Sequence, residues 1–299
     1  MPTSVFLANI PKKRTAIYTR PSNPIPRKFT ARDGRILEAI HAYDGMLADY
    51  QIKYLFFTGE TQLRLRMRFL YQHGYVARPD YKRRASLNHM VYWLDTKGAA
   101  YVAGLAGAPL EDFVYLKEPR WSQLDHDLAI SDVRITFTKA CEQNQTLSLE
   151  QWIPQSEFYS RPDKVEYIDP NGKKAHRNIR PDGYIIVRKG GHLFRLLLEL
   201  DMSSEDNHRI GREKVLPGIA YIESKVYAQR FGHNSGRWLF VTTSERRLRN
   251  MKRQTEVVAG KAARLFYFTT FEQVTPDALL TGDIWWQGMA ESPTALFRT

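Results

Sequence analysis

The sequence predicts an α/β protein with two domains, a winged helix-turn-helix followed by a mixed sheet flanked by helices. In the N-terminal half, three helix-like segments precede two strand-like runs, which is the element order of a winged helix. In the C-terminal half, helical and strand patterns alternate, as in a sheet that carries helices on its faces. A chain of 299 residues is also long for one small domain, so two domains are expected.

The net charge is strongly positive, with 44 Lys and Arg residues against 32 Asp and Glu residues. Such a surplus favours a polyanionic partner, either nucleic acid or an anionic membrane surface. The membrane alternative is weak, because no segment approaches the roughly 20 apolar residues of a spanning helix and no basic amphipathic helix is evident. The N-terminus lacks a signal-peptide pattern, and the single cysteine, Cys141, excludes an internal disulfide framework. We therefore expect a cytoplasmic protein that binds double-stranded DNA and no membrane.

Residues 1–29 are predicted to form a basic, proline-rich arm. The segment carries six Lys and Arg residues, five prolines and no acidic residue. The prolines prevent a helix, and the apolar residues are too few to fold alone. Lys12, Lys13 and Arg14 are candidate contacts to the DNA backbone, and a solvated tail explains the composition equally well.

Residues 30–108 are predicted to form the winged helix. Thr30 is a suitable N-cap for a first helix, a second helix is expected over 47–56, and a third begins after Thr61. Strands are expected from residue 75 and over 90–94, joined by a basic turn, with a further helix from Thr96. The third helix would enter the major groove and the turn would lie on phosphates. The candidate DNA contacts are Arg64, Arg66 and Arg68 on the third helix and Lys82, Arg83 and Arg84 in the turn; the alternative for the helix is a solvated face.

Residues 109–122 are the predicted linker, punctuated by Pro109 and Pro119, and residues 123–299 form the second domain. Its expected elements are a helix over 124–142, a strand over 147–153, a hairpin over 180–201, a helix over 207–230, a strand over 237–243, a helix over 244–265 and a strand over 266–270.

The hairpin over 180–201 carries the most informative pattern. Gly190-Gly191 lies between two strand-like runs and is a strong signal for a two-residue turn. With that turn, Lys189 pairs with His192, and Asp182 lies directly opposite Glu199. Adjacent carboxylates repel unless they share a cation or a proton, and Mg²⁺ or Mn²⁺ commonly takes one or two carboxylates plus water. The sequence therefore predicts a metal site at Asp182 and Glu199.

An alternative interpretation of the same strand is an ordinary charged face. Asp201 shares the predicted face of Glu199, and the register places Arg180 across from Asp201 as an ion pair in solvent.

Several motifs together resemble a known family. Asp182 after Pro181, a hairpin and then Glu199 resemble the PD-(D/E)XK nuclease superfamily, and residues 30–270 resemble the replication-relaxation family of mobile-element and plasmid-associated proteins. The matching segments are LDHDLAISDVR, RPDGYIIV, LLLELDMSSED and the spacing of Ile210, Lys214 and Tyr221. The resemblance implies a winged helix joined to a PD-(D/E)XK nuclease-like domain, with DNA and other proteins of the same mobile element as partners.

The resemblance also implies the roles of individual residues. The superfamily expects a lysine two residues after the glutamate, where this chain has Asp201, and Lys214 in the next helix is the candidate replacement. Pro217-Gly218 should break or kink that helix, so a solvated Lys214 is the alternative. His126 is a candidate contact to the scissile phosphate and Asp127 a further carboxylate, each against an ordinary place in the first turn of a helix. Glu157 is a weaker metal candidate.

Two functions remain open from the sequence. In the first, Asp182 and Glu199 hold Mg²⁺, Asp201 assists, Lys214 activates water and His126 contacts the phosphate, which gives a metal-dependent DNA endonuclease. In the second, the protein is a non-catalytic DNA-binding regulator or assembly factor of replication or transfer that retains an inactive nuclease fold. The aspartate at position 201 keeps the second function open.

Overall fold

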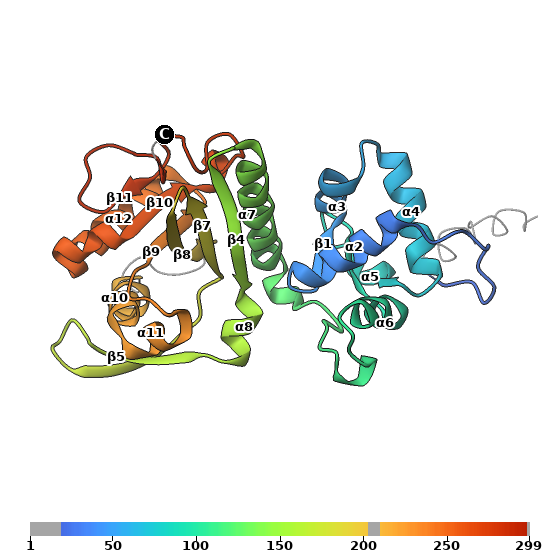
Figure 1. The fold of residues 1–299 in the computed structure, drawn as a ribbon, viewed down its shortest axis with the longest axis horizontal. Coiled ribbons are helices and arrows are strands. Elements are labelled where there is room, and N and C mark those ends of the chain that lie inside the picture. The colour runs from blue at the N-terminus through green and yellow to red at the C-terminus, as the bar shows by residue number, and fades with distance from the viewer. Residues whose placement is uncertain (1–18, 203–209, 298–299) are drawn as a thin grey trace, which may run out of the picture. The chain divides into compact units, whose positions relative to one another are not determined.

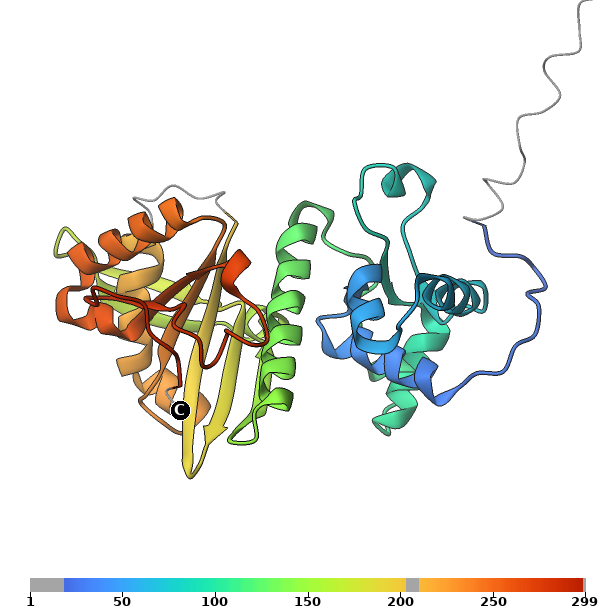
Figure 2. The ribbon, with the colours of Figure 1, turned by 90° about the horizontal axis from the view of Figure 1, so that it is seen from above.

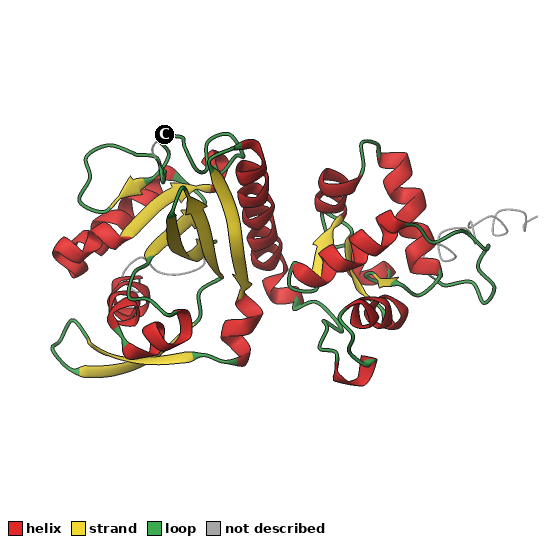
Figure 3. Cartoon of the chain, in the orientation of Figure 1, coloured by secondary structure: helices red, strands yellow, loops and turns green. Residues whose placement is uncertain are grey.

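A computed structural model describes residues 19–202 and 210–297, without the side chains of residues 211 and 212. The chain divides into two compact units, with the boundary between Leu124 and Asp125. Together the elements form an α/β structure, and each unit is described by itself below (Figures 1 and 3).

The first unit combines helices with a small antiparallel sheet in the order β1-β3-β2. Its principal elements are α2 (Ala31–Ala42), β1 (Met46–Ala48), α3 (Asp49–Phe56), α4 (Glu60–Gln72), β2 (Val76–Ala77), α5 (Tyr81–Arg84), β3 (Val91–Leu94) and α6 (Thr96–Leu105). The apolar faces of α2, α4 and α6 meet in one core with β3. Two short 3₁₀ turns, η1 (Leu110–Asp112) and η2 (Trp121–Gln123), lie in the predicted linker.

Two local predictions for this unit are wrong. The second helix begins at Asp49 rather than at residue 47, because Met46, Leu47 and Ala48 are all buried and pair with β3 as a third strand. The basic turn also contains the short helix α5, whose N-cap residue Asp80 accepts a hydrogen bond from the backbone of Arg83 at 2.7 Å. Both features depend on contacts that a local apolar pattern does not contain.

Part of the predicted arm is fixed to the first unit. Residues 19–29 form no helix or strand, as expected, but Arg20 makes an ion pair with Asp95. Its guanidinium also donates to the carbonyls of Tyr71 at 2.8 Å and Val76 at 2.9 Å. This basic residue of the arm is therefore an internal anchor.

The second unit is built on a mixed six-stranded sheet in the order β11-β10-β9-β8-β7-β4. The strands are β4 (Leu147–Pro154), β7 (Gly183–Lys189), β8 (His192–Asp201), β9 (Arg237–Thr242), β10 (Phe266–Thr270) and β11 (Trp286–Gln287). β8, β9 and β10 run parallel, whereas β4, β7 and β8 form an antiparallel meander and β11 is antiparallel to β10. The predicted mixed sheet flanked by helices is confirmed.

Both faces of this sheet are covered. The long helix α7 (Leu124–Gln143) packs on one face together with residues near the C-terminus (Figure 2). The other face is covered by α10 (Leu216–Glu223), α11 (Lys225–Phe231) and α12 (Glu245–Ala259), with residues of α8 (Gln155–Ser160) and of a separate hairpin. That hairpin consists of β5 (Asp163–Ile168) and β6 (Lys174–Ile179) and was not predicted.

The predicted helix over 207–230 is wrong as one continuous element. Among the described residues, a π-helical turn over Gly211–Val215 is followed by α10 and α11, which meet at Ser224. Pro217 lies in the first turn of α10, where its missing N–H costs little. The strand at 266–270 is as predicted, and the helix before it gives way to the 3₁₀ segment η4 (Gly260–Leu265). In the described parts of the chain, the helices are too short or too polar to cross a lipid bilayer.

The start of α2 depends on a buried carboxylate. Asp33 has no exposed surface and accepts hydrogen bonds from the backbone and hydroxyl of Thr30, which confirms the predicted N-cap. Arg66 of α4 makes an ion pair with the same carboxylate and donates to the carbonyl of Lys28 at 2.9 Å. Arg66 therefore joins α4 to the start of α2.

We expect Arg66→Ala to destabilise the protein by about 1–3 kcal/mol, because it leaves the buried carboxylate of Asp33 with fewer partners. Arg64→Ala and Arg68→Ala, on the exposed side of the same helix, are matched controls that should change stability by less than about 0.5 kcal/mol. Urea unfolding measures all three variants. Equal stability of the three would show that the Asp33 pair contributes nothing.

Candidate functional site

The β7–β8 hairpin has the predicted register. Gly190 takes a positive φ of 57°, and Lys189 pairs with His192 across the turn. The ladder ends at Gly183 and Leu198, and the Asp182 backbone still donates to the Leu198 carbonyl at 2.9 Å. Asp182 and Glu199 are the next residues beyond the last ladder pair, at the point where β7 leaves β8 and β8 continues alongside β9.

The carboxylates at this end of β8 are buried rather than solvated. Asp182, Glu199 and Asp201 are 7%, 8% and 9% exposed, because helices cover both faces of the sheet. The alternative of a charged strand in solvent, with Arg180 paired to Asp201, is therefore wrong. Buried carboxylates need cationic or hydrogen-bonding partners, and each has them.

Asp182 is held from the backbone and from α7. Its Oδ2 accepts a hydrogen bond from the Leu200 backbone at 2.7 Å and lies 3.3 Å from Nε2 of His126. His126 also approaches Asp127, whose Oδ1 accepts a hydrogen bond from Gln155 at 2.9 Å. The first turn of α7 thus brings His126 to the predicted site.

The electrostatic environment keeps His126 charged. Burial lowers its pKa, but hydrogen bonds to Asp127 and Asp182 and the charges of Asp182 and Glu199 outweigh burial and raise the pKa to about 10. At neutral pH the imidazolium therefore neutralises part of the carboxylate charge.

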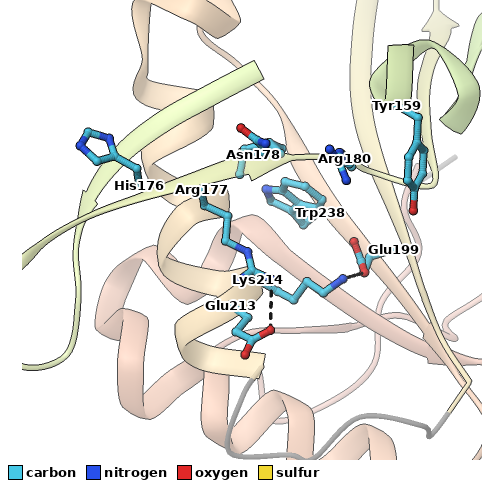
Figure 4. Close-up of a pocket in the computed structure, with 10 residues that line it drawn as sticks. Tyr159, His176, Arg177, Asn178, Arg180, Glu199, Glu213, Lys214 and Trp238 are labelled. Carbon is cyan, nitrogen blue, oxygen red and sulfur yellow. Dashed lines mark hydrogen bonds and ion pairs between the residues drawn. The ribbon is translucent and has the colours of Figure 1, made fainter. Parts of the chain in front are cut away.

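Lys214 reaches the site from the other face of the sheet. It lies in the π-helical turn just before α10, and its ammonium makes an ion pair with Glu199 (Figure 4). The Pro217-Gly218 pair helps to place this turn, since a Cβ at Gly218 would lie 2.9 Å from Nε1 of Trp238 on β9. The expected disruption of the helix thus allows close packing, and a merely solvated Lys214 is excluded.

Asp201 has a different set of partners. Arg247 of α12 donates to both of its oxygens at 2.9 Å, and the hydroxyl of Thr242 donates at 2.6 Å. This bidentate pair fixes the end of β8 to β9 and α12. The position at which the nuclease superfamily has its lysine therefore carries a structural ion pair.

The donor set of the site fits a hard divalent cation of the Mg²⁺ type. Asp182 and Glu199 supply oxygen ligands, and such an ion takes one or two carboxylates and completes its shell with water. Within the described ranges there is no group of three or more His, Cys, Asp or Glu side chains arranged to enclose a metal ion. Glu157 on α8 is exposed.

A pocket of about 410 Å³ adjoins Glu199. Glu199 and Lys214 line it together with Arg177 of β6 and Arg180, which directly follows that strand (Figure 4). The sequence-based prediction missed this wall because it assigned no helix or strand to residues 154–179. The signal was present in Asn171-Gly172, a turn dipeptide between two alternating runs.

The candidate DNA contacts of the first unit fall into three groups. Arg64 and Arg68 are exposed on α4, and Lys82, Arg83 and Arg84 lie on α5, where the Arg83 guanidinium is 4.8 Å from the Trp121 ring. Arg66 instead makes the internal pair with Asp33. The arm residues Lys12, Lys13 and Arg14 lie outside the described residues.

The family model of replication-relaxation proteins matches residues 38–233, well over half of the chain. The chain belongs to the replication-relaxation family. The match includes α7, the β7–β8 hairpin and Lys214, so His126, Asp182, Glu199 and Lys214 lie within the family region. No curated protein and no solved structure matches this replication-relaxation protein.

In the metal-free protein, we expect the His126 imidazole to remain protonated at pH 7 and to titrate near pH 10. Since this pKa is above the ordinary 6.5, charged His126 stabilises the fold fully below pH 6.5. That stabilisation, about 1.4 kcal/mol for each unit by which the pKa is raised, is lost as the pH rises through about 10. An NMR titration of imidazole nitrogen shifts measures the midpoint. Asp182→Asn should lower it, and a midpoint near 6.5 in the parent protein would contradict the arrangement.

Proposed function

We propose that this replication-relaxation protein binds double-stranded DNA through its first unit and hydrolyses a DNA strand in its second unit, with Mg²⁺ or Mn²⁺ as cofactor. The observation that carries the proposal is the meeting of Asp182 and Glu199 with His126 and Lys214 at one end of the sheet. Buried groups of opposite charge with a strongly shifted pKa are typical of active sites.

Binding by the first unit is supported by its architecture and charge. Helices α2, α3 and α4 with the sheet β1-β3-β2 have the composition of a winged helix, in which α4 would enter the major groove. Arg64 and Arg68 are exposed on α4, and the α5 cations would contact phosphates. Arg66 is left out of the proposed contacts.

In the proposed reaction, a water oxygen attacks the phosphorus and the bond to the leaving sugar oxygen breaks. Bound at Asp182 and Glu199, the metal ion would supply Lewis-acid stabilisation of the phosphate charge. Lys214, held against Glu199, orients the attacking water, and charged His126 faces the phosphate. Asp201 assists indirectly, since its pair with Arg247 positions the strand that carries Glu199.

A second candidate is a non-catalytic DNA-binding factor that regulates replication or transfer of a mobile element. The observation in its favour is that His126 and Lys214 already neutralise the two carboxylates without a metal ion. In this case the ion pairs would be structural, and cleavage assays separate the two candidates.

For binding, we expect the affinity for duplex DNA to fall steeply with salt, with each phosphate contact contributing about −0.9 to the log–log slope. Replacing Lys82, Arg83 and Arg84 together with Ala should make the slope less steep, by the contribution of up to about three phosphate contacts. Fluorescence anisotropy across a salt series measures this slope. An unchanged slope would show that α5 does not touch the backbone.

For catalysis, we expect purified protein to nick or cleave DNA with Mg²⁺ or Mn²⁺ and to show little turnover with Ca²⁺. Asp182→Asn and Glu199→Gln should each abolish cleavage while DNA affinity is kept, and Lys214→Ala should slow it by roughly 10². Asp125→Asn, an exposed carboxylate beside His126, is the matched control and should cleave normally.

The non-catalytic candidate predicts a different result in the same assays. Absence of cleavage with either metal on linear, supercoiled and branched DNA, together with unchanged DNA affinity of both carboxylate variants, would favour the non-catalytic factor.

A further inference from the structure

The pocket beside the carboxylates has walls from several segments that are distant in the sequence. One wall is β6 of the unpredicted hairpin, and the opposite side is formed by the π-helical turn with Glu213 and Lys214. Trp238 of β9 lies at its base, with Nε1 donating to the Gly218 carbonyl at 3.2 Å (Figure 4). The volume of about 410 Å³ is within the range of about 300–1,000 Å³ that small ligands occupy.

The pocket combines a cation with an exposed aromatic ring. Tyr159, at the end of α8, is 48% exposed, and the Arg180 guanidinium lies 5.0 Å from its ring centre. Arg180 is itself exposed and makes no ion pair with any residue that the structure describes. By contrast, Arg177 on β6 is paired with Glu213 at 3.1 Å. An exposed aromatic ring next to a guanidinium without an ion-pair partner is an arrangement that can bind an unstacked base and its phosphate.

The β5–β6 hairpin, which forms this wall, is held in place by contacts with α10 and α11. Asp163 of β5 accepts a hydrogen bond from the buried Tyr221 hydroxyl. It also makes an ion pair with Arg230 at 3.1 Å. Arg230 also donates to the Arg161 carbonyl at 2.8 Å. The pocket wall is therefore preformed rather than a free loop.

The position of the pocket relates its occupant to the carboxylate site. Glu199 and Lys214 belong to both, so a strand whose phosphate lies at the carboxylates would place a neighbouring nucleotide in the pocket. Within a duplex, that base is paired and stacked and offers no free face. Taking it out of the stack costs free energy, which is lowest for a base that is already unpaired.

We propose that this pocket holds one unpaired nucleotide of the strand that is cut, with its base against Tyr159 and its phosphate beside Arg180. The inference rests on the proposed function and adds the substrate class, which is DNA that is single-stranded next to the cleaved bond. Asn178, exposed on the same wall, offers an amide to the edge of the base.

The test compares two DNA probes on the full chain in Ca²⁺, by fluorescence anisotropy. One probe is a blunt duplex, and the other is the same duplex with a short unpaired tail. The parent protein should bind the tailed probe about tenfold more tightly, since one stacked base contributes roughly that factor. Tyr159→Ala should remove this preference, Tyr159→Phe should keep it, and affinity for the blunt duplex should not change.

Arg180→Gln tests the phosphate contact. It should weaken binding of the tailed probe and reduce its salt slope by about 0.7, the value for one contact to a single strand. Lys173→Gln is the matched control, because it removes one exposed charge from the turn of the same hairpin, outside the pocket. It should leave both quantities unchanged, and thermal melting should confirm that all variants fold.

Any one of three binding results would overturn the inference: no preference of the parent protein for the tailed probe, a preference that survives in Tyr159→Ala, or equal losses in Arg180→Gln and Lys173→Gln. These readouts need no turnover. A preference for the tailed probe that depends on Tyr159, found together with no DNA cleavage in Mg²⁺ or Mn²⁺, would contradict the proposed nuclease activity and support the pocket as a binding site for single-stranded DNA. Cleavage of the blunt duplex by Tyr159→Ala at the rate of the parent protein would support the nuclease activity and contradict the proposed role of the pocket.

Discussion

The arrangement of the second unit depends on how two buried carboxylates are neutralised where β7 leaves β8. Asp182 and Glu199 lie just beyond the last pair of the β7–β8 ladder and are both buried, so each needs a cationic or hydrogen-bonding partner. Each receives one from a different layer, His126 from α7 and Lys214 from the turn before α10. Because these elements pack on opposite faces of the sheet, the carboxylates connect both layers at one end of the fold.

A buried cluster of this kind is a costly way to stabilise a protein. Apolar residues of similar volume would often be as stable or more so, because desolvation offsets much of the attraction between the charges. Asp201 shows the contrast, since its bidentate pair with Arg247 is a structural contact that fixes the edge of the site. In the proposed function, the charges at Asp182 and Glu199 would act on a phosphate group, which would explain why a costly buried cluster is kept.

Local signals in the sequence predicted the parts of the fold that depend on neighbouring residues. Gly190-Gly191 determined the hairpin register, and Thr30 marked the start of α2, because turn and cap geometries are set within a few residues. The signals failed where tertiary contacts decide. Apolar residues 46–48 continue a helical pattern but pair with β3, and Pro217 begins a helix that it was expected to break.

The site residues also divide into those that neighbouring residues in the sequence determine and those that tertiary contacts determine. The opposition of Asp182 and Glu199 followed from counting along one hairpin, whereas the partners of His126 and Lys214 depend on how two helical segments pack against the sheet. The basic residues were the hardest to assign, since charge alone does not distinguish an inward from an outward arginine. Arg66 and Arg20 proved to be internal contacts, and Arg180 proved to line a pocket.

The proposed function requires that Asp182 and Glu199 bind a divalent cation. The most direct measurement is anomalous diffraction from crystals of the full chain soaked in Mn²⁺. We expect a peak between the two carboxylates, lost in crystals of the Glu199→Gln variant. A map without that peak at saturating Mn²⁺, with His126 and Lys214 still paired to the carboxylates, would contradict the claim.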